Sequence, residues 1–314
     1  MAPVLVRTSH LRTWSLLRVT DLVSTILPMI RTNRLQVVLL FALGLTVALL
    51  GCESSSGGSN GTGGSGGSPS GVLRILVTND DGVGAEGIDV LVEGLRTTNP
   101  NDELIVSAPA ENQSGSSDNT DCATGNATDA MTQSGYPATA VDGCPADAVN
   151  YALDPANGLY DADSQPHVVI SGINEGQNVS APVATGLSGT VGAAKTAARD
   201  HDIPALASSQ GSSLGSPLQD AEYDYGSGVE AVLAWLAAHR GALAAGDVTT
   251  AEVDSINIPT CVTGSIRGTV DVPMAELTTD AFSPQDCEST LEQPRDDAEA
   301  FTNGYTAVSA VPAD

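Results

Sequence analysis

Two adjacent carboxylates follow a short apolar segment in the first third of the chain. Asn79-Asp80-Asp81-Gly82 comes directly after residues 73–78, LRILVT. Adjacent carboxylates repel each other unless a cation neutralises them. Carboxylate, amide and hydroxyl oxygens suit hard divalent ions such as Mg²⁺, Mn²⁺ or Ca²⁺. The pattern therefore indicates a metal site, although Asn, Asp and Gly are also the residues of an ordinary turn.

Three further polar segments follow other apolar runs. Ser114 lies in the loop after a predicted strand, and Asn174 ends another strand, with Asn178 four residues later. Residues 188–190 begin an Ala-rich helix, where free N–H groups and the helix dipole attract anions such as phosphate. Taken singly, each segment has a simpler interpretation as a polar loop, a turn or a helix N-cap.

Strands and helices alternate along the chain and would position these segments. Ile88, Leu91, Val92 and Leu95 have the spacing of a helix with one buried face. The pattern predicts strands at 73–78, 104–108, 138–141, 168–171, 203–207, 255–259 and 305–311, and helices at 85–96, 146–153, 188–199 and 223–239. This alternation predicts a three-layer, doubly wound, Rossmann-like α/β fold with a mostly parallel sheet. Such sheets bind ligands at the carboxyl ends of their strands.

The chain is strongly acidic, with 12 basic against 38 acidic residues and a formal net charge of −26. Such a surface repels nucleic-acid backbones, so we expect no nucleic-acid polymer as a partner. It suits solubility at high salt, which makes a saline habitat a hypothesis from composition. Lys195 is the only lysine, and a solvated position on its helix is expected.

The N-terminal region has the order of a secretory signal. A basic stretch at 31–34 precedes an apolar run at 35–50, and Gly51-Cys52 follows. The cysteine makes the segment resemble a bacterial lipoprotein signal, with Cys52 as the lipidated residue. A plain transmembrane anchor is the alternative. We expect residues 1–51 to be the signal region, with Met29 as an alternative start.

The Ser- and Gly-rich residues 52–71 cannot bury apolar surface, so we expect a flexible tether. Residues 72–314 would then form the folded domain. The predicted product is an exported lipoprotein, attached to a membrane only by its lipid and facing the periplasm or the cell surface.

Four cysteines remain after Cys52, and an even number in an oxidising compartment suggests disulfides. Proximity in sequence favours Cys122 with Cys144 and Cys261 with Cys287, although three connectivities are possible. A thiolate metal site is the weaker alternative, because the chain has no CxxC spacing.

The ordered set of motifs resembles the SurE survival-protein family. The resemblance begins with residues 73–82 and Gly87-Ile88. It continues through residues 112–115, 143–147, 171–178, 188–194 and 255–259. Each motif is weak alone, but their order matches from Val72 to about Pro259.

The resemblance implies a metal-dependent phosphatase of the 5′-nucleotidase or acid phosphatase type. Its substrates would be small phosphate monoesters, chiefly nucleoside 5′- and 3′-monophosphates. The implied metal ligands are Asp80, Asp81, Ser114 and Asn174, and the implied phosphate ligands are Asn79, Asn178, Ser188, Gly189 and Thr190. Asp80 and Asp81 would be the catalytic residues, and Asp80 is the first choice for an acid or base.

This chain departs from the family in several places. Glu111 and Gln113 stand where the family often has basic residues, which puts the substrate preference in doubt. Residues 122–131 look like a polar insertion, and residues 261–293 match poorly. The family implies a homodimer, but it usually has a longer C-terminal arm that swaps between subunits, so the oligomeric state stays open.

Two other functions remain open from the sequence. One is a surface-tethered binding protein of the same fold without catalytic activity. The other is a phosphatase with an aspartate nucleophile, which usually needs an Asp-x-Asp pattern rather than adjacent aspartates.

Overall fold

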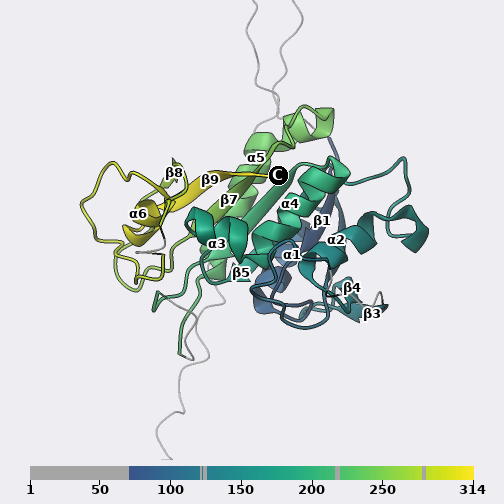
Figure 1. Ribbon diagram of the computed structural model, residues 1–314, viewed down its shortest axis with the longest axis horizontal. Coiled ribbons are helices and arrows are strands. Elements are labelled where there is room, and N and C mark those ends of the chain that lie inside the picture. The colour runs from purple at the N-terminus through teal and green to yellow at the C-terminus, as the bar shows by residue number, and fades with distance from the viewer. Residues whose placement is uncertain (1–70, 121, 123–125, 216–219, 278–280) are drawn as a thin grey trace, which may run out of the picture. The chain divides into compact units, whose positions relative to one another are not determined.

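The computed structural model describes residues 71–314, except 121, 123–125, 216–219 and 278–280 (Figure 1). Its strands form one sheet in the order β3-β4-β2-β1-β5-β6-β7-β9-β8. The central pairs, from β4 to β7, are all parallel. The predicted α/β fold with a mostly parallel sheet is confirmed.

The strands are β1 Arg74–Thr78, β2 Glu103–Pro109, β3 Ala127–Met131, β4 Pro137–Val141, β5 Val168–Glu175, β6 Ala205–Gln210, β7 Glu252–Ile258, β8 Thr269–Asp271 and β9 Thr306–Pro312. The α-helices are α1 Glu86–Thr98, α2 Pro145–Leu153, α3 Ala181–Gly186, α4 Gly189–His201, α5 Tyr225–Ala245 and α6 Asp297–Thr302. A short 3-10 helix spans Pro155–Asn157. The predicted elements are all present, with shifted ends.

Helices cover both faces of the sheet, because alternate residues of each central strand point to opposite sides. In β1, Ile75 and Val77 belong to the core beneath α1 and α5, whereas Leu76 belongs to the core beneath α2 and α4. In β5, Ile170 likewise belongs to the core beneath α1 and α5, and Val169 belongs to the core beneath α2 and α4. Both cores consist mainly of aliphatic side chains with little or no exposure, together with a few aromatic rings such as Trp235 and Tyr160.

Several elements were not predicted. β3 lies within the segment expected to be a polar insertion, and it pairs antiparallel with β4 at the sheet edge. Its residues are exposed or half-buried, so no alternating apolar pattern marks it as a strand. The helices α3 and α6 have six residues each, and β8 has three, which is too short for a clear period.

The strand order reverses direction between β1 and β5. From β1, the chain first builds the sheet outward through β2, and later returns to place β5 on the other side of β1. In doubly wound folds, ligands bind at this switch point, outside the carboxyl ends of the strands. Asp80 and Asp81 follow β1, and Asn174 lies near the end of β5. The topology therefore brings these residues to one edge.

Lys195 is buried, with 7% of its surface exposed, so the expected solvated position is wrong. The reason is that α4 packs against both the sheet and α2, and all its residues from Gly189 to Ala198 are buried. Another enclosed charge is paired: the half-buried Arg240 on α5 makes two hydrogen bonds to Asp102, at 2.9 and 2.5 Å. The Asp102 side chain is 3% exposed.

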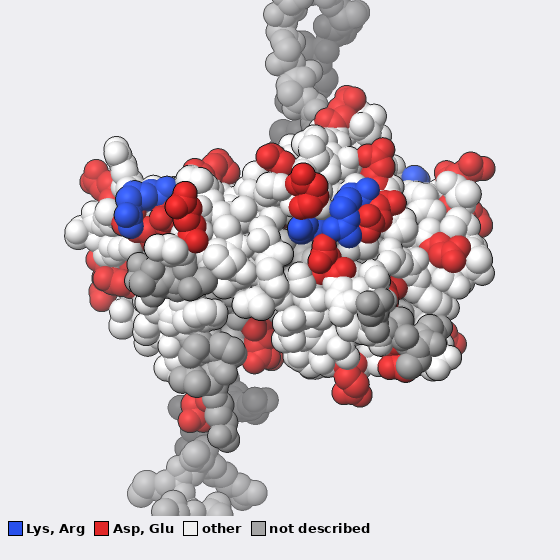
Figure 2. All heavy atoms as spheres, in the orientation of Figure 1, with Lys and Arg blue, Asp and Glu red and all other residues white. Residues whose placement is uncertain are grey.

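On the visible face, acidic side chains outnumber basic ones, and the few basic groups lie beside acidic ones (Figure 2). The described cysteines form two disulfides, Cys122–Cys144 and Cys261–Cys287, which are the pairs favoured by sequence proximity. Within the described residues, no helix combines the length and the apolar character needed to span a membrane. The predicted signal, the lipidated Cys52 and the tether lie outside these residues, apart from Gly71.

Candidate active site

Asn79 shapes the turn that presents the two aspartates. Its side chain is fully buried and folds back on the turn. The Oδ1 atom accepts the N–H of Gly82 at 3.2 Å, and Nδ2 donates to the Gly82 carbonyl at 3.0 Å. Gly82 has a φ of 102°, which glycine adopts without steric cost. In this structure the side chain of Asn79, a predicted phosphate ligand, is therefore used to stabilise the turn.

Asp80 points at the N-terminus of α4. Thr190 donates its hydroxyl to Oδ1 of Asp80 at 2.6 Å. The backbone N–H groups of Gly189 and Thr190 also hydrogen bond to this carboxylate. Burial raises the pKa of Asp80, and these hydrogen bonds oppose the rise. The predicted anion site at this helix terminus thus holds a carboxylate of the protein itself.

Ser188 precedes this terminus and caps the helix. Its hydroxyl oxygen accepts the N–H of Val191 at 3.0 Å. Such a cap satisfies a backbone donor that the helix leaves unpaired. The hydroxyl of the predicted phosphate ligand Ser188 is therefore occupied by the helix.

Asp81 is held by two donors from other segments. Its Oδ2 atom accepts the backbone N–H of Glu175 at 2.8 Å, and its Oδ1 atom accepts Nδ2 of Asn112 at 3.3 Å. Burial, followed by repulsion from the neighbouring Asp80, raises the pKa of Asp81 to about 7. A bound cation would counter both effects, since it favours the ionised carboxylates.

The loop that carries Ser114 is tied to both aspartates. The N–H of Gln113 donates to the Asp80 carbonyl at 2.7 Å. Asn112, which donates to Asp81, also accepts the N–H of Ser114 at 2.9 Å. The loop is exposed at Ser114, so its hydroxyl lies at an open edge of the site.

A buried polar network extends the site across the ends of β6 and β7. Nδ2 of Asn178 donates to the Ser209 hydroxyl at 2.9 Å and approaches the Thr190 hydroxyl at 3.4 Å. The Asn178 N–H donates to Oδ1 of Asn257 at 2.7 Å. Asn174 is also buried, and its Nδ2 atom donates to the Gly176 carbonyl at 2.7 Å.

Direct hydrogen bonds thus link four of the predicted site residues to one another: Asp80, Gly189, Thr190 and Asn178. Among the described residues, neither Ser114 nor Asn174 hydrogen bonds to either aspartate through its side chain. Three residues of the network were not predicted as site residues: Asn112, Ser209 and Asn257. The sequence did contain a sign of the role of Asn257, because it is a polar residue between two isoleucines of a predicted strand.

The donor set fits a hard divalent cation. Two adjacent carboxylates, an amide and a hydroxyl offer only oxygen ligands, as Mg²⁺, Mn²⁺ and Ca²⁺ prefer. Among the described residues, no Lys or Arg forms an ion pair with Asp80 or Asp81. The acidic pair, with Asp80 buried and Asp81 half-buried, therefore has no ion-pair partner among the described residues, and a metal ion would offset its charge.

A family model described as survival protein SurE matches residues 75–281. The 5′-nucleotidase SurE of Halobacterium salinarum is 38% identical over 197 residues, which cover 59% of this chain and 65% of the relative. That of Methanopyrus kandleri is 42% identical over 138 residues, or 44% of this chain and 49% of the relative. This chain therefore spans less than two thirds of the length of either relative.

A solved structure shares the fold. The crystal structure of the SurE protein from Aquifex aeolicus superimposes with a TM-score of 0.56 at 22% sequence identity. The match covers 77% of this chain and 94% of that one.

Proposed function

We propose that this chain, which belongs to the survival protein SurE family, is a metal-dependent phosphatase that hydrolyses nucleoside 5′- and 3′-monophosphates. Family membership confirms the resemblance drawn from the ordered motifs. The matched relatives carry the name 5′-nucleotidase, which supports the substrate class. The observation that carries the proposal is the adjacent carboxylate pair, in which Asp80 is buried against the N-terminus of α4 and Asp81 is half-buried beside it.

The residues around this pair would divide the work. Asp80 and Asp81, with Ser114 and Asn174, would hold a divalent cation, Mg²⁺, Mn²⁺ or Ca²⁺. Such an ion polarises a phosphoryl oxygen and activates a water molecule. Thr190 and the α4 backbone keep Asp80 oriented.

Phosphate oxygens would meet donors supplied by the chain itself. Asn178 has an amide at the same edge, and the α4 dipole favours negative charge there. These groups are fixed before substrate arrives, because a buried hydrogen-bond network holds them. Donors positioned in advance stabilise charge in the transition state at little reorganisation cost.

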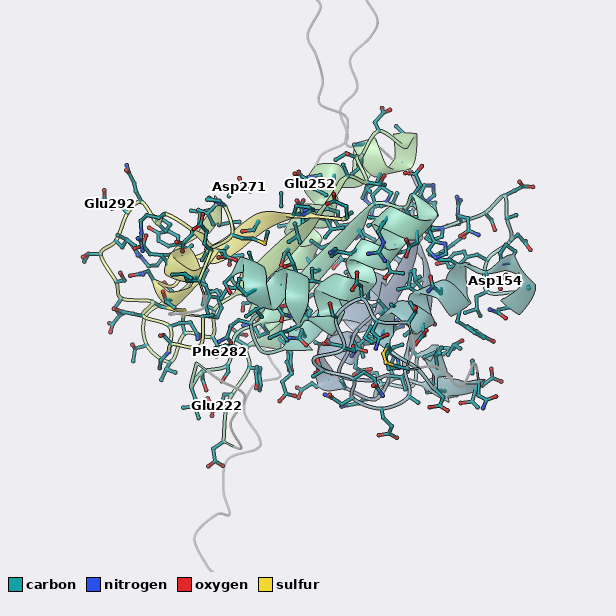
Figure 3. All side chains as sticks on the ribbon, viewed as in Figure 1. Asp154, Glu222, Glu252, Asp271, Phe282 and Glu292 are labelled. Atoms are coloured by element: carbon teal, nitrogen blue, oxygen red, sulfur yellow. A yellow bond between two sulfur atoms is a disulfide. The ribbon has the colours of Figure 1, made fainter. Side chains whose placement is uncertain are left out.

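The proposal is tested by measuring phosphate release from the detergent-solubilised full chain. Substrates are 5′- and 3′-nucleoside monophosphates and p-nitrophenyl phosphate, with Mg²⁺, Mn²⁺, Ca²⁺ or EDTA. We expect metal-dependent turnover in the wild type and none in Asp81→Asn. Asp271→Asn is the matched control, because Asp271 is exposed on β8 (Figure 3). Folded protein without turnover under any metal would overturn the enzyme proposal and favour a binding protein.

Export and lipid anchoring are part of the proposal. They rest on the signal-like sequence before Cys52, and the two disulfides of the described residues support an oxidising location. Labelled palmitate should be incorporated into the wild type and not into Cys52→Ser. A homodimer remains a prediction from the family and is tested by light scattering.

A further inference from the structure

Two stacked tyrosines stand before and at the start of α5. The ring centroids of Tyr223 and Tyr225 are 5.7 Å apart, with 19° between the ring planes. Tyr225 is buried in the core and packs against α1, where a Cβ on Gly87 would lie 3.1 Å from its Cε1 atom. Only 4% of the residues are aromatic, so two adjacent, stacked aromatic rings are uncommon in this chain.

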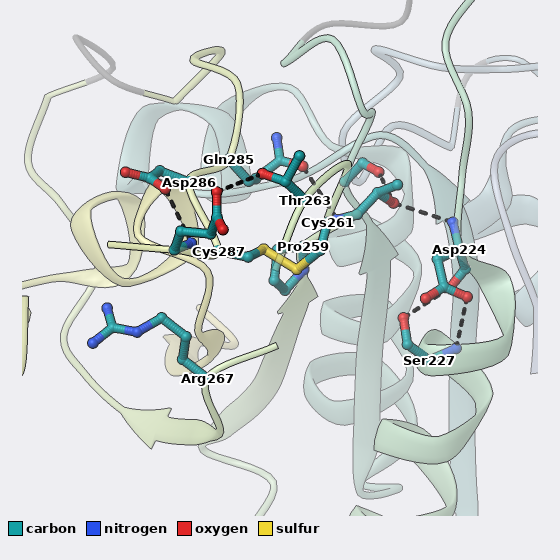
Figure 4. The surroundings of a disulfide bond; sticks show 12 residues. Asp224, Ser227, Pro259, Cys261, Thr263, Arg267, Gln285, Asp286 and Cys287 are labelled. Carbon is teal, nitrogen blue, oxygen red and sulfur yellow. Dashed lines mark hydrogen bonds between the residues drawn. A yellow bond between two sulfur atoms is a disulfide. The ribbon is translucent and has the colours of Figure 1, made fainter. Parts of the chain in front are cut away.

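The turn that carries the pair is firmly held. Asp224 lies between the tyrosines and caps α5 by accepting the N–H of Ser227 at 3.3 Å. Its own N–H donates to the Thr260 hydroxyl at 3.1 Å. Thr260 directly precedes Cys261, whose disulfide with Cys287 lies nearby (Figure 4). The turn therefore presents the rings from fixed backbone.

The tyrosine pair lies beside the candidate metal site. The Tyr223 hydroxyl lies next to the carboxylate of Glu175, and the Glu175 N–H donates to Asp81. After burial, the charges of Glu175 and Asp81 raise the pKa of Tyr223, to about 12. Glu175 thus contacts Asp81 through its N–H and Tyr223 through its side chain, and Tyr225 lies near Ile173, the residue before Asn174. These contacts place the tyrosine pair at the same edge of the sheet as the aspartates.

Tyr223 offers its ring rather than its hydroxyl. The residue is half-buried, whereas its hydroxyl oxygen is buried. Tyr225 covers the ring from behind. What remains for a ligand is ring surface next to a polar, acidic site. An aromatic face at such a place suits a flat, uncharged group that is attached to the phosphate.

Charge gives a second reason to look for recognition away from the phosphate. Glu175 is exposed beside the two aspartates, and no described Lys or Arg forms an ion pair with any of the three. A phosphate held here would therefore rely on a metal ion and on neutral donors such as the Asn178 amide. Contacts to the ester group have to supply much of the selectivity.

We propose that Tyr223, backed by Tyr225, stacks on the nucleobase of a bound nucleoside monophosphate. The inference rests on the proposed phosphatase function and identifies how that site selects its substrate class. Every nucleobase has a π-face, so stacking favours nucleotides over alkyl phosphates without choosing strongly among bases.

The test compares Tyr223→Ala and Tyr223→Phe on 5′-AMP and on glycerol phosphate, which has no ring. For Tyr223→Ala we expect the KM for AMP to rise about tenfold, equivalent to about 1.4 kcal/mol. The kcat for AMP and the kinetics on glycerol phosphate should stay near those of the wild type. Tyr223→Phe should retain the wild-type KM. Tyr136→Ala is the control, because it removes another half-buried tyrosine ring.

Equilibrium dialysis of 5′-AMP against each protein, with Mg²⁺, separates this inference from the phosphatase proposal. Weaker AMP binding in Tyr223→Ala supports stacking even if no substrate is turned over, in which case the phosphatase proposal alone fails. Unchanged AMP binding and KM in Tyr223→Ala would overturn the stacking. An equal loss on AMP and glycerol phosphate would also overturn it, since that result means a general disturbance of the site.

Discussion

A single methyl group at Gly189 should disable the site without unfolding the protein. Gly189 is the first residue of α4, and its Cα faces Asp80. A Cβ there would lie 2.8 Å from the Cβ of Asp80, 2.9 Å from its Oδ2 atom and 2.8 Å from the Ser116 hydroxyl. Three contacts from two segments therefore crowd the same point, and Gly189→Ala needs one or both segments to move.

The size of this movement follows from the contact distances. Ordinary contacts of a Cβ begin at 3.4 Å, so a contact of 2.8 Å requires a shift of roughly 0.6 Å. Active sites tolerate misplacement of about 0.5 Å, and a misplacement of about 1 Å can cost a hundredfold in rate. We expect kcat/KM to fall between about tenfold and a hundredfold, equivalent to about 1.4–2.7 kcal/mol of transition-state stabilisation.

Stability should change far less than activity. Alanine is a better helix former than glycine by up to about 1 kcal/mol, which offsets part of the local strain. The assay measures kcat/KM for a nucleoside monophosphate beside the thermal unfolding midpoint. Gly186→Ala is the matched control, since nothing lies within 4 Å of a Cβ at Gly186. Wild-type kcat/KM in folded Gly189→Ala would refute the reasoning.

Three further predictions concern stability. Replacing Cys261 and Cys287 with alanine should lower the free energy of unfolding by about 3 kcal/mol, because the bond closes a loop with a separation of 26 residues; urea unfolding measures this. Asp102→Ala should cost about 3 kcal/mol by the same measurement, since it leaves the largely enclosed Arg240 guanidinium and the buried Leu73 N–H without their acceptor. Arg199→Gln should cost less than about 1 kcal/mol at pH 7, because its ion pair with Asp118 is partly exposed.

The last of these effects depends on pH with a definite sign. A hydrogen bond from Arg199 lowers the pKa of Asp118 in the folded protein. The stabilisation is therefore present above the unfolded pKa of about 3.9 and disappears as the pH falls through the lower folded value. Urea unfolding between pH 3 and pH 7 should show the wild type and Arg199→Gln converging at the acid end. A constant difference across this range would contradict the assignment.

Controls test the causes given for the other two stability losses, those of the cysteine variant and of Asp102→Ala. The double cysteine variant and the wild type are both unfolded without reductant, because reduction would also break the Cys122–Cys144 bond that the variant retains. Cys261→Ala alone should show the same loss as the double variant, since either change removes the same disulfide. For Asp102→Ala, a cost under about 1 kcal/mol would mean that water reaches the stranded guanidinium.

The sequence by itself determined the order of the longer strands and helices, and with it the fold class, but not β3, α3, β8 or α6. Apolar runs of five or six residues alternate with helical patterns, and short polar segments end the runs at residues 79–82 and 174–178. These are local properties, because propensity and periodicity act within a few residues. The ordered motifs were also sufficient to identify the family, which depends on residue types and not on coordinates.

The tertiary structure alone decided which side chains meet. Asp80 and Thr190 are 110 residues apart, and their hydrogen bond exists because β1 and α4 converge at one edge of the sheet. No periodicity within either segment encodes that contact. The same holds for Tyr223 beside the aspartates and for the burial of Lys195, which follows from α2 and the sheet enclosing α4. Contacts between distant segments depend on strand order and layer packing, and these emerge only when the whole sheet is assembled.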